Sequence, residues 1–179
     1  LSGAKWAPPT FEDDDDFTIP FGQAEIMKPG SDCTIVAAGR PVHFALDAAE
    51  ALEEDGIDCE VINVRTYRPL DIETIVESVT KTGYCVVVDQ SWPFASVGAE
   101  VAAQIYERAM DYLDNTIARV NNDDVPPPYA RGLEQEMLPN TQKIAEAVRL
   151  LSQAKRPLIH AGSGVIHAQA FQELVAVAV

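Results

Sequence analysis

The chain has 179 residues, 47% of them hydrophobic, which excludes a disordered protein and allows one domain with a substantial core. The formal net charge of -15 argues against nucleic acids and anionic membranes as partners, because both would repel the chain. A basic protein would be attracted, although the same charge can also serve solubility alone.

Residues 1–22 are predicted to be a linker. They contain Pro8-Pro9, an acidic run from Glu12 to Asp16, and Pro20, which together are typical of a solvated tether. The aspartates lack the spaced, glycine-bearing pattern of a calcium loop. No signal peptide or membrane-crossing run is visible, and the start at Leu1 indicates a processed or truncated product.

Four short apolar runs predict strands, and a segment with helical periodicity follows each of them. The predicted strands are residues 33–38, 59–64, 84–89 and 117–120. The predicted helices begin at Pro41, Asp71, Val97 and Asn140 or Thr141. Strands that are apolar throughout and alternate with helices indicate a sheet covered on both faces. Residues 23–150 are therefore predicted to form one three-layer α/β/α domain with a mostly parallel sheet.

The helix ends carry specific signals. Asp71 is expected to be an N-cap, because its carboxylate can accept a hydrogen bond from the first-turn amides. Gly56 and Gly83 suit the left-handed conformation in which helices commonly end. Lys81 is placed to interact with the negative end of its helix.

Residues 151–179 are predicted to be a partial strand–helix extension. Residues 156–165 have the pattern of a strand that ends in a glycine turn, and residues 168–179 that of a helix. A single strand and helix cannot bury their own apolar faces, so this extension must dock on something or remain loose.

Few residues indicate chemistry. Cys33, Cys59 and Cys85 lie in predicted strands, and none is part of a CxxC pair. This pattern predicts a reducing compartment without disulfides. It also argues against metal binding and nucleophilic chemistry by these thiols. Asn121-Asn122 has no acidic glycine turn upstream and is expected to be a turn. The segment Val125-Pro-Pro-Pro-Tyr129 could be a polyproline ligand, but inside a domain it is expected to be a rigid loop.

Several segments nevertheless resemble one enzyme family. The segments are Phe21-Gly-Gln-Ala-Glu25, Arg65-Thr-Tyr-Arg-Pro-Leu-Asp-Ile-Glu-Thr-Ile75, Trp92-Pro through Gly98-Ala-Glu100, Asp111-Tyr-Leu-Asp114 and Asp124-Val-Pro-Pro-Pro-Tyr-Ala130. Over about residues 17–150 the chain resembles the C-terminal, transketolase-like domain of the pyruvate dehydrogenase E1 component β subunit. Residues 153–179 resemble the start of the central domain of acetolactate synthase-type thiamine diphosphate enzymes. The chain departs from the β-subunit pattern at Ser96, Asn115-Thr116 and Asn121-Asn122.

The resemblance implies a part of a thiamine-dependent pyruvate dehydrogenase (acetyl-transferring). The alternatives are a non-catalytic protein-binding module and the corresponding domain of a branched-chain 2-oxo acid dehydrogenase. Thiamine diphosphate and Mg2+ would serve the assembled enzyme, but the carboxylate on the cofactor ring and the diphosphate motif belong to parts that this chain lacks. We therefore expect no catalytic, cofactor-binding or metal-binding residues here, and an inactive isolated chain.

The resemblance also implies partners. They are the α subunit and a second β subunit in an α2β2 heterotetramer, and the peripheral-subunit-binding domain of the dihydrolipoyl acetyltransferase, which is basic. Asp114 corresponds to a docking carboxylate, although it could equally be a turn residue that closes a helix. Related chains end near Arg149 and Leu150, where the terminus helps docking, so residues 151–179 are expected to hinder that contact. The implied compartment is the mitochondrial matrix or the bacterial cytoplasm.

Overall fold

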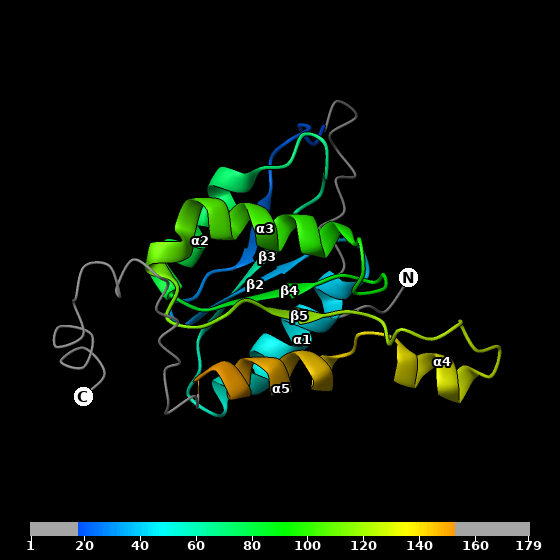
Figure 1. The fold of residues 1–179 in the computed structure, drawn as a ribbon. Coiled ribbons are helices and arrows are strands. Elements are labelled where there is room, and N and C mark those ends of the chain that lie inside the picture. The colour runs from blue at the N-terminus through cyan, green and yellow to red at the C-terminus, as the bar shows by residue number, and fades with distance from the viewer. Residues whose placement is uncertain (1–17, 153–179) are drawn as a thin grey trace, which may run out of the picture.

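The computed structural model describes residues 18–152, so most of the expected extension and most of the expected linker lie outside the described residues, while Leu151 and Ser152 are the last residues of a helix. The described residues form a five-stranded sheet between two layers of helices (Figure 1). In chain order the elements are β1 (Glu25–Lys28), β2 (Cys33–Ala37), α1 (Pro41–Glu53), β3 (Cys59–Asn63), α2 (Ile72–Thr82), β4 (Cys85–Val88), α3 (Val97–Ala109), the 3-10 helix η1 (Met110–Tyr112), β5 (Ala118–Val120), α4 (Arg131–Met137) and α5 (Thr141–Ser152).

The strand order is β1-β3-β2-β4-β5, and all neighbouring pairs except β1 with β3 are parallel. Each strand from β2 to β4 is followed by a helix that packs on a face of the sheet and leads back to the start of the next strand. The chain turns in opposite directions after β2 and β4, so the carboxyl ends of these two neighbours form a topological switch point. The predicted three-layer α/β/α architecture with a mostly parallel sheet is confirmed.

Two apolar cores lie on the two faces of the sheet. Helices α1 and α5 cover one face, where α1 packs on β2 and β3 and α5 packs on β4 and β5, and Leu46, Leu52 and Val148 are buried in this core. Helices α2 and α3 cover the other face, where Ile75 and Ile105 are fully buried. Every residue of β2 and β4 is buried, because a parallel sheet with helices on both sides leaves no face for water.

The predicted helix signals are largely confirmed. Asp71 caps α2 through a hydrogen bond from the Thr74 amide, and Gly83 ends this helix with a left-handed φ of 71°. Helix α1 begins at Pro41, as a proline at the first helical position predicts. Val97 does open α3, but its side chain is 40% exposed, so only the later members of the predicted stripe contribute to the core.

Two short elements have no counterpart among the predicted ones. Strand β1 is an antiparallel edge strand whose register shifts between Ile26 and Lys28, and only half-buried or exposed residues form it. Helix α4 has seven residues, of which only Met137 is buried. Neither element has an apolar pattern that sequence periodicity could detect. Among the described residues, no helix is long and apolar enough to cross a membrane.

Candidate functional site

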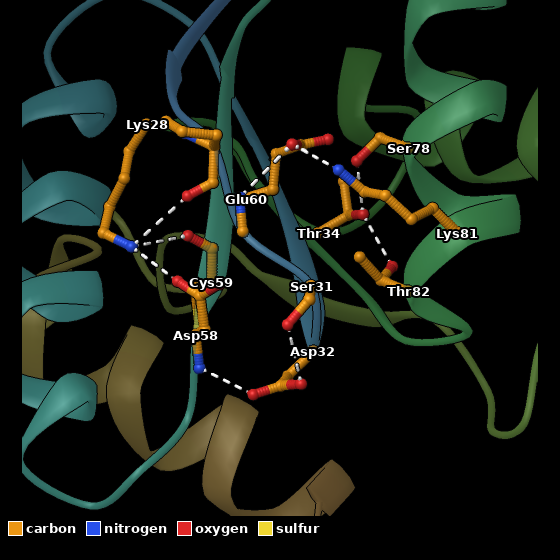
Figure 2. Close-up of polar contacts among 12 residues, drawn as sticks. Lys28, Ser31, Asp32, Thr34, Asp58, Cys59, Glu60, Ser78, Lys81 and Thr82 are labelled. Carbon is orange, nitrogen blue, oxygen red and sulfur yellow. Dashed lines mark hydrogen bonds and ion pairs between the residues drawn. The ribbon is translucent and has the colours of Figure 1, made fainter.

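The amino-terminal edge of the sheet contains a buried carboxylate on β3 (Figure 2). The side chain of Glu60 is 3% exposed, and its Oε2 lies 2.6 Å from Nζ of Lys81 at the end of α2. The Gly30 amide donates to the same oxygen at 3.3 Å. Burial by itself raises the pKa of Glu60, but the hydrogen bonds from Lys81, Ser78 and Gly30 lower it below its ordinary value. Glu60 is therefore an ionised structural carboxylate.

Hydroxyl groups beside Glu60 join β2 to α2 (Figure 2). Oγ1 of Thr34 shares hydrogen bonds with Oγ of Ser78 at 2.7 Å and with Oγ1 of Thr82 at 2.8 Å. All three side chains are buried, and each finds its partner inside the protein. This part of the edge is internally satisfied and offers no free polar group to a ligand.

Lys28 forms a second ionic cluster at the same edge (Figure 2). Its Nζ lies 2.9 Å from Oδ1 of Asp58 and 3.1 Å from Oε1 of Glu53. Burial would lower the pKa of Lys28, but the hydrogen bonds to Asp58 and Glu53 raise it above its ordinary value. The cluster ties the edge strand β1 to the loop between α1 and β3, so its role is structural.

Asp114, the predicted docking carboxylate, lies in the turn between η1 and β5. Its backbone amide donates to the carbonyl of Gly83 at 2.9 Å, which fixes the turn against the end of α2. Its side chain is exposed and has no ion-pair partner among residues 18–152. The backbone of Asp114 thus closes a turn, while its carboxylate is exposed.

Arg149 and Leu150 lie near the end of α5. Nε and Nη2 of Arg149 lie 2.8 Å and 2.7 Å from Oδ2 of Asp55, which follows α1. The side chain of Leu150 is 66% exposed. Arg149 is therefore engaged within the domain, whereas the Leu150 side chain makes little contact with the other described residues.

The three predicted partner-binding residues lie at one edge but in different layers. Asp114 directly precedes β5 beside the end of α2, and Asp55, the partner of Arg149, precedes β3 after α1. Both positions are at the amino-terminal edge of the parallel strands. Helices α2 and α5 lie on opposite faces of the sheet (Figure 1), so the structure does not bring the three residues into one compact patch.

The carboxyl-terminal edge contains the switch point, where parallel α/β sheets usually bind ligands. Oδ2 of Asp89 accepts hydrogen bonds from Oγ of Ser91 at 2.7 Å and from the Gly98 amide at 2.8 Å. A Cβ at Gly98 would lie 2.9 Å from Cβ of Asp89, so only glycine allows this approach. The hollow beside Asp89 measures about 10 Å³, which holds about one water and no substrate.

A larger hollow of about 400 Å³ lies between α1 and the connection from α4 to α5. Among its lining residues, Arg40 is the only charged one, and its guanidinium lies 5.4 Å from the centre of the Phe44 ring. The lining contains no carboxylate, thiol or imidazole that could transfer a proton or attack a substrate. This hollow therefore offers no group for acid–base or nucleophilic chemistry.

Exposed aromatic residues surround the switch point, and sequence reasoning assigned them no role. Tyr67, Trp92 and Phe94 are 47%, 50% and 87% exposed. Nη1 of Arg119 donates to the Pro93 carbonyl at 3.0 Å, which holds the loop that carries Trp92 and Phe94. Exposed aromatic groups on a fixed loop are typical of a protein interface. The sequence feature that could have indicated this surface is the aromatic, proline-containing segment directly after a buried strand.

The described residues do not fit a thiamine diphosphate–metal centre. Among them, no three His, Cys, Asp or Glu side chains are grouped so as to hold a metal ion. Nδ2 of Asn121 and Oδ1 of Asn122 are buried and have no hydrogen-bond partner among the described residues, and no acidic group that could hold a metal ion is grouped with them. Hydrogen bonding to Cys59 and burial raise the pKa of Cys33, and burial raises that of Cys85 to about 12, so both thiols remain protonated.

Comparisons with known proteins agree with the observed fold. Residues 22–144 match the family described as "Transketolase, C-terminal domain". The chain is 50% identical over 131 residues to the pyruvate dehydrogenase E1 component subunit beta of Rickettsia felis, covering 73% of this chain and 40% of that protein. It is 46% identical over 150 residues to the mitochondrial subunit beta of Bos taurus, covering 83% of this chain and 42% of that protein.

A solved structure described as a split-gene transketolase, inactive beta4 tetramer, matches with a TM-score of 0.69 and 28% identity. The match covers 83% of this chain and 48% of that one. The chain thus spans less than half the length of each of these relatives.

Proposed function

Because the chain belongs to the transketolase C-terminal domain family, we propose that it is part of the β subunit of a thiamine-dependent pyruvate dehydrogenase (acetyl-transferring). The observation that carries this proposal is the 50% identity over 131 residues to a protein named as that subunit. The enzyme would decarboxylate pyruvate and pass the acetyl group to lipoamide. The chain would supply subunit assembly and docking rather than reacting groups.

The cofactor chemistry belongs to other parts of the assembly. When bound there, thiamine diphosphate supplies the electron sink that decarboxylation of a 2-oxo acid needs. Among the described residues no three His, Cys, Asp or Glu side chains are grouped to hold a metal ion, and we expect no step of the reaction to run through them. Their contribution is a rigid sheet, with exposed aromatic groups at its carboxyl edge and Asp114 at its amino edge. The compartment would be the mitochondrial matrix or the bacterial cytoplasm.

Assembly and turnover test this proposal together. The full 179-residue chain is purified alone and with the α subunit of the same source, and complex formation, thiamine diphosphate binding and pyruvate decarboxylation are measured. We expect a stable complex with the α subunit, and neither cofactor binding nor decarboxylation by the chain alone. Tight cofactor binding or turnover by the isolated chain would contradict the proposed division of roles.

Docking to the acyltransferase core is the second part of the proposal. Asp114 would contact the basic peripheral-subunit-binding domain, since its carboxylate is exposed and unpaired among residues 18–152. Asp114→Asn should lower the affinity, mainly by slowing association if the contact lies at the rim of the interface. Glu73→Gln removes an equal charge at the opposite edge and should leave the affinity unchanged. Equal affinities for both variants would remove Asp114 from the docking site.

One observation favours a second function, that of a non-catalytic binding module. The hollow at the switch point holds about one water, while the aromatic groups around it are exposed. Such a module would bind a basic partner without turnover in any assembly. Recovery of pyruvate decarboxylation when the chain completes an α-containing assembly would exclude this alternative.

A further inference from the structure

A loop with closed ends projects from the carboxyl edge of the sheet. We name it the arm; it consists of residues Asp123–Met137 and includes α4. The Asp123 amide donates to the Met137 carbonyl at 3.0 Å, which closes the base of the arm. Nζ of Lys143 lies 3.2 Å from Oδ1 of Asp123 and 2.6 Å from the Glu136 carbonyl oxygen. Figure 1 shows α4 standing away from the sheet and its helix layers. Loops with such closed ends are frequently functional.

The arm presents apolar side chains to water. The side chains of Val125 and Leu133 are 47% and 57% exposed, and Tyr129 is fully exposed. Met137, at the base, is 5% exposed and anchors the arm to the body of the domain. Leu133 and Met137 are four residues apart in α4, so they share one face of this helix, and Tyr129 lies just before its N-cap residue Ala130. Exposed apolar groups of this kind mark an interaction surface.

Three prolines and the closed base restrict the conformations of the arm. Pro126, Pro127 and Pro128 each restrict φ, and the closed base fixes both ends of the loop. A segment that is already restricted loses less conformational entropy on binding. Tyrosine in such a position is among the residues that contribute most strongly to interfaces.

The charged side chains on the arm indicate what kind of partner it can bind. Asp124, Glu134 and Glu136 are exposed on the arm, against a single exposed Arg131. A second copy of this chain would bring another net charge of -15, so self-association through the arm is opposed. A partner with an apolar slot between basic side chains would complement both the exposed apolar side chains and the acidic flanks.

We propose that the arm is the element that docks the α subunit, with Tyr129 and Leu133 entering an apolar slot whose rim is basic. This inference rests on the proposed function, because it takes the α subunit as the partner. It adds the surface and the side chains that bind. Asp114, the proposed docking carboxylate, lies at the opposite edge, so the acyltransferase core and the α subunit would bind at separate places.

The test is the dissociation constant of the full chain and the purified α subunit, measured by isothermal titration calorimetry. Tyr129→Ser should weaken binding by about thirtyfold, because a central tyrosine is lost from the interface. The matched control is Tyr112→Ser, which removes a tyrosine that is 55% exposed at the amino edge and should change the constant by less than about threefold. Circular dichroism should show both variants folded, since neither side chain belongs to a core.

Charge reversal provides a second readout. Glu134→Lys should slow association, and the dependence of the association rate on ionic strength should weaken, because a favourable charge is replaced by a repulsive one. Glu54→Lys makes the same change of charge at the exposed end of α1, at the opposite edge of the sheet, and should leave this dependence nearly unaltered.

The outcomes separate this inference from the function on which it rests. If the wild-type chain does not bind the α subunit, both proposals fail. If the wild type binds and Tyr129→Ser binds equally well, only the role of the arm is wrong. If the chain alone forms a dimer that Tyr129→Ser dissociates, the occupant is a second copy, and the inference is overturned.

Discussion

At the residue scale, the described structure contains both a buried, compensated carboxylate and an exposed, unpaired one. Glu60 is buried and ionised because Lys81 and the Gly30 amide compensate it, whereas Asp114 is exposed with its carboxylate unpaired among the described residues. Removing a partner from the first group leaves an uncompensated buried charge, which affects stability. Changing the second group affects only encounters with other molecules. The two kinds of site therefore call for different measurements.

Lys81→Met should lower the free energy of unfolding by about 1–2 kcal/mol at neutral pH, because Glu60 loses its cation while staying buried. The loss is moderate because the Lys81 side chain is 49% exposed and water can replace part of the interaction. Urea unfolding measures the change. The same substitution in a Glu60→Gln background should cost much less, and an equal cost in both backgrounds would contradict the pairing.

The cost of Lys81→Met should also depend on pH. The pKa of Glu60 is lowered in the folded state, so its stabilisation is complete above the unfolded pKa of about 4.3. It is lost as the pH falls through the lower folded pKa. The difference in unfolding free energy between wild type and Lys81→Met should therefore shrink below about pH 4. A difference that stays constant down to acidic pH would mean that Glu60 is not the partner.

Alanine substitutions at two glycines can distinguish an effect of backbone strain from an effect on docking. Gly56 and Gly83 have φ values of 77° and 71°, so alanine at either should cost about 1–2 kcal/mol of unfolding free energy. A Cβ at Gly83 would also lie 2.5 Å from Oδ2 of Asp114, whereas Gly56 has open space. We expect Gly83→Ala to displace the Asp114 carboxylate and to weaken binding of the acyltransferase domain. Gly56→Ala, with similar thermal stability, should bind normally.

At the element scale, caps and buried stripes determine where the helices lie. Asp71 accepts hydrogen bonds from the Thr74 amide at 3.3 Å and from Oγ1 of Thr74 at 2.8 Å. Its Oδ2 also accepts from the Ala24 amide at 2.8 Å, so one carboxylate begins α2 and holds the segment before β1. Ser96 caps α3 through a single hydrogen bond from the Ala99 amide at 3.0 Å.

Asp71→Ala should therefore destabilise the protein more than Ser96→Ala. Loss of a helix cap costs about 1 kcal/mol, and the unpaired Ala24 amide should raise the cost of Asp71→Ala to about 2–3 kcal/mol. Urea unfolding of both variants gives the comparison. Hydrogen exchange at the Ala24 amide should accelerate in Asp71→Ala alone, and unchanged exchange there would show that the tie to β1 contributes little.

At the scale of the whole molecule, the two apolar cores are built from the described residues. Helix α5 continues through Leu151, which is 7% exposed in the core, and ends at Ser152. A cut designed to remove the C-terminal extension should therefore fall after Ser152. A cut after Leu150 would also remove a buried side chain.

A chain that ends at Ser152 should unfold with a free energy close to that of the full chain and should bind the acyltransferase domain more tightly, because the extension next to Leu150 is expected to hinder docking. A chain that ends at Leu150 should lose about 2 kcal/mol or more, since a buried leucine is removed. Thermal unfolding and a pull-down with the binding domain measure the two effects. Equal binding with and without residues 153–179 would defeat the expected hindrance.

The sequence by itself determined the layers of this protein. Apolar runs such as that at Cys33–Ala37, capped helices such as that after Asp71, and the glycine stop at Gly83 are local signals, and they suffice to predict a mostly parallel sheet between helices. The short edge strand β1 escaped prediction because its pairing with the distant strand β3 holds it, and helix α4 escaped because only Met137 among its residues is buried.

Only the tertiary structure decided how the candidate surfaces are arranged. It placed Asp114 and Arg149 at one edge but in opposite helix layers, engaged Arg149 with Asp55, and left Tyr129 exposed on a closed arm. Spacing along the chain contains no information about which loops meet at an edge of a sheet, because strand order and crossover direction determine that. Exposure likewise depends on what the rest of the fold covers, so these features could not be derived from residue patterns.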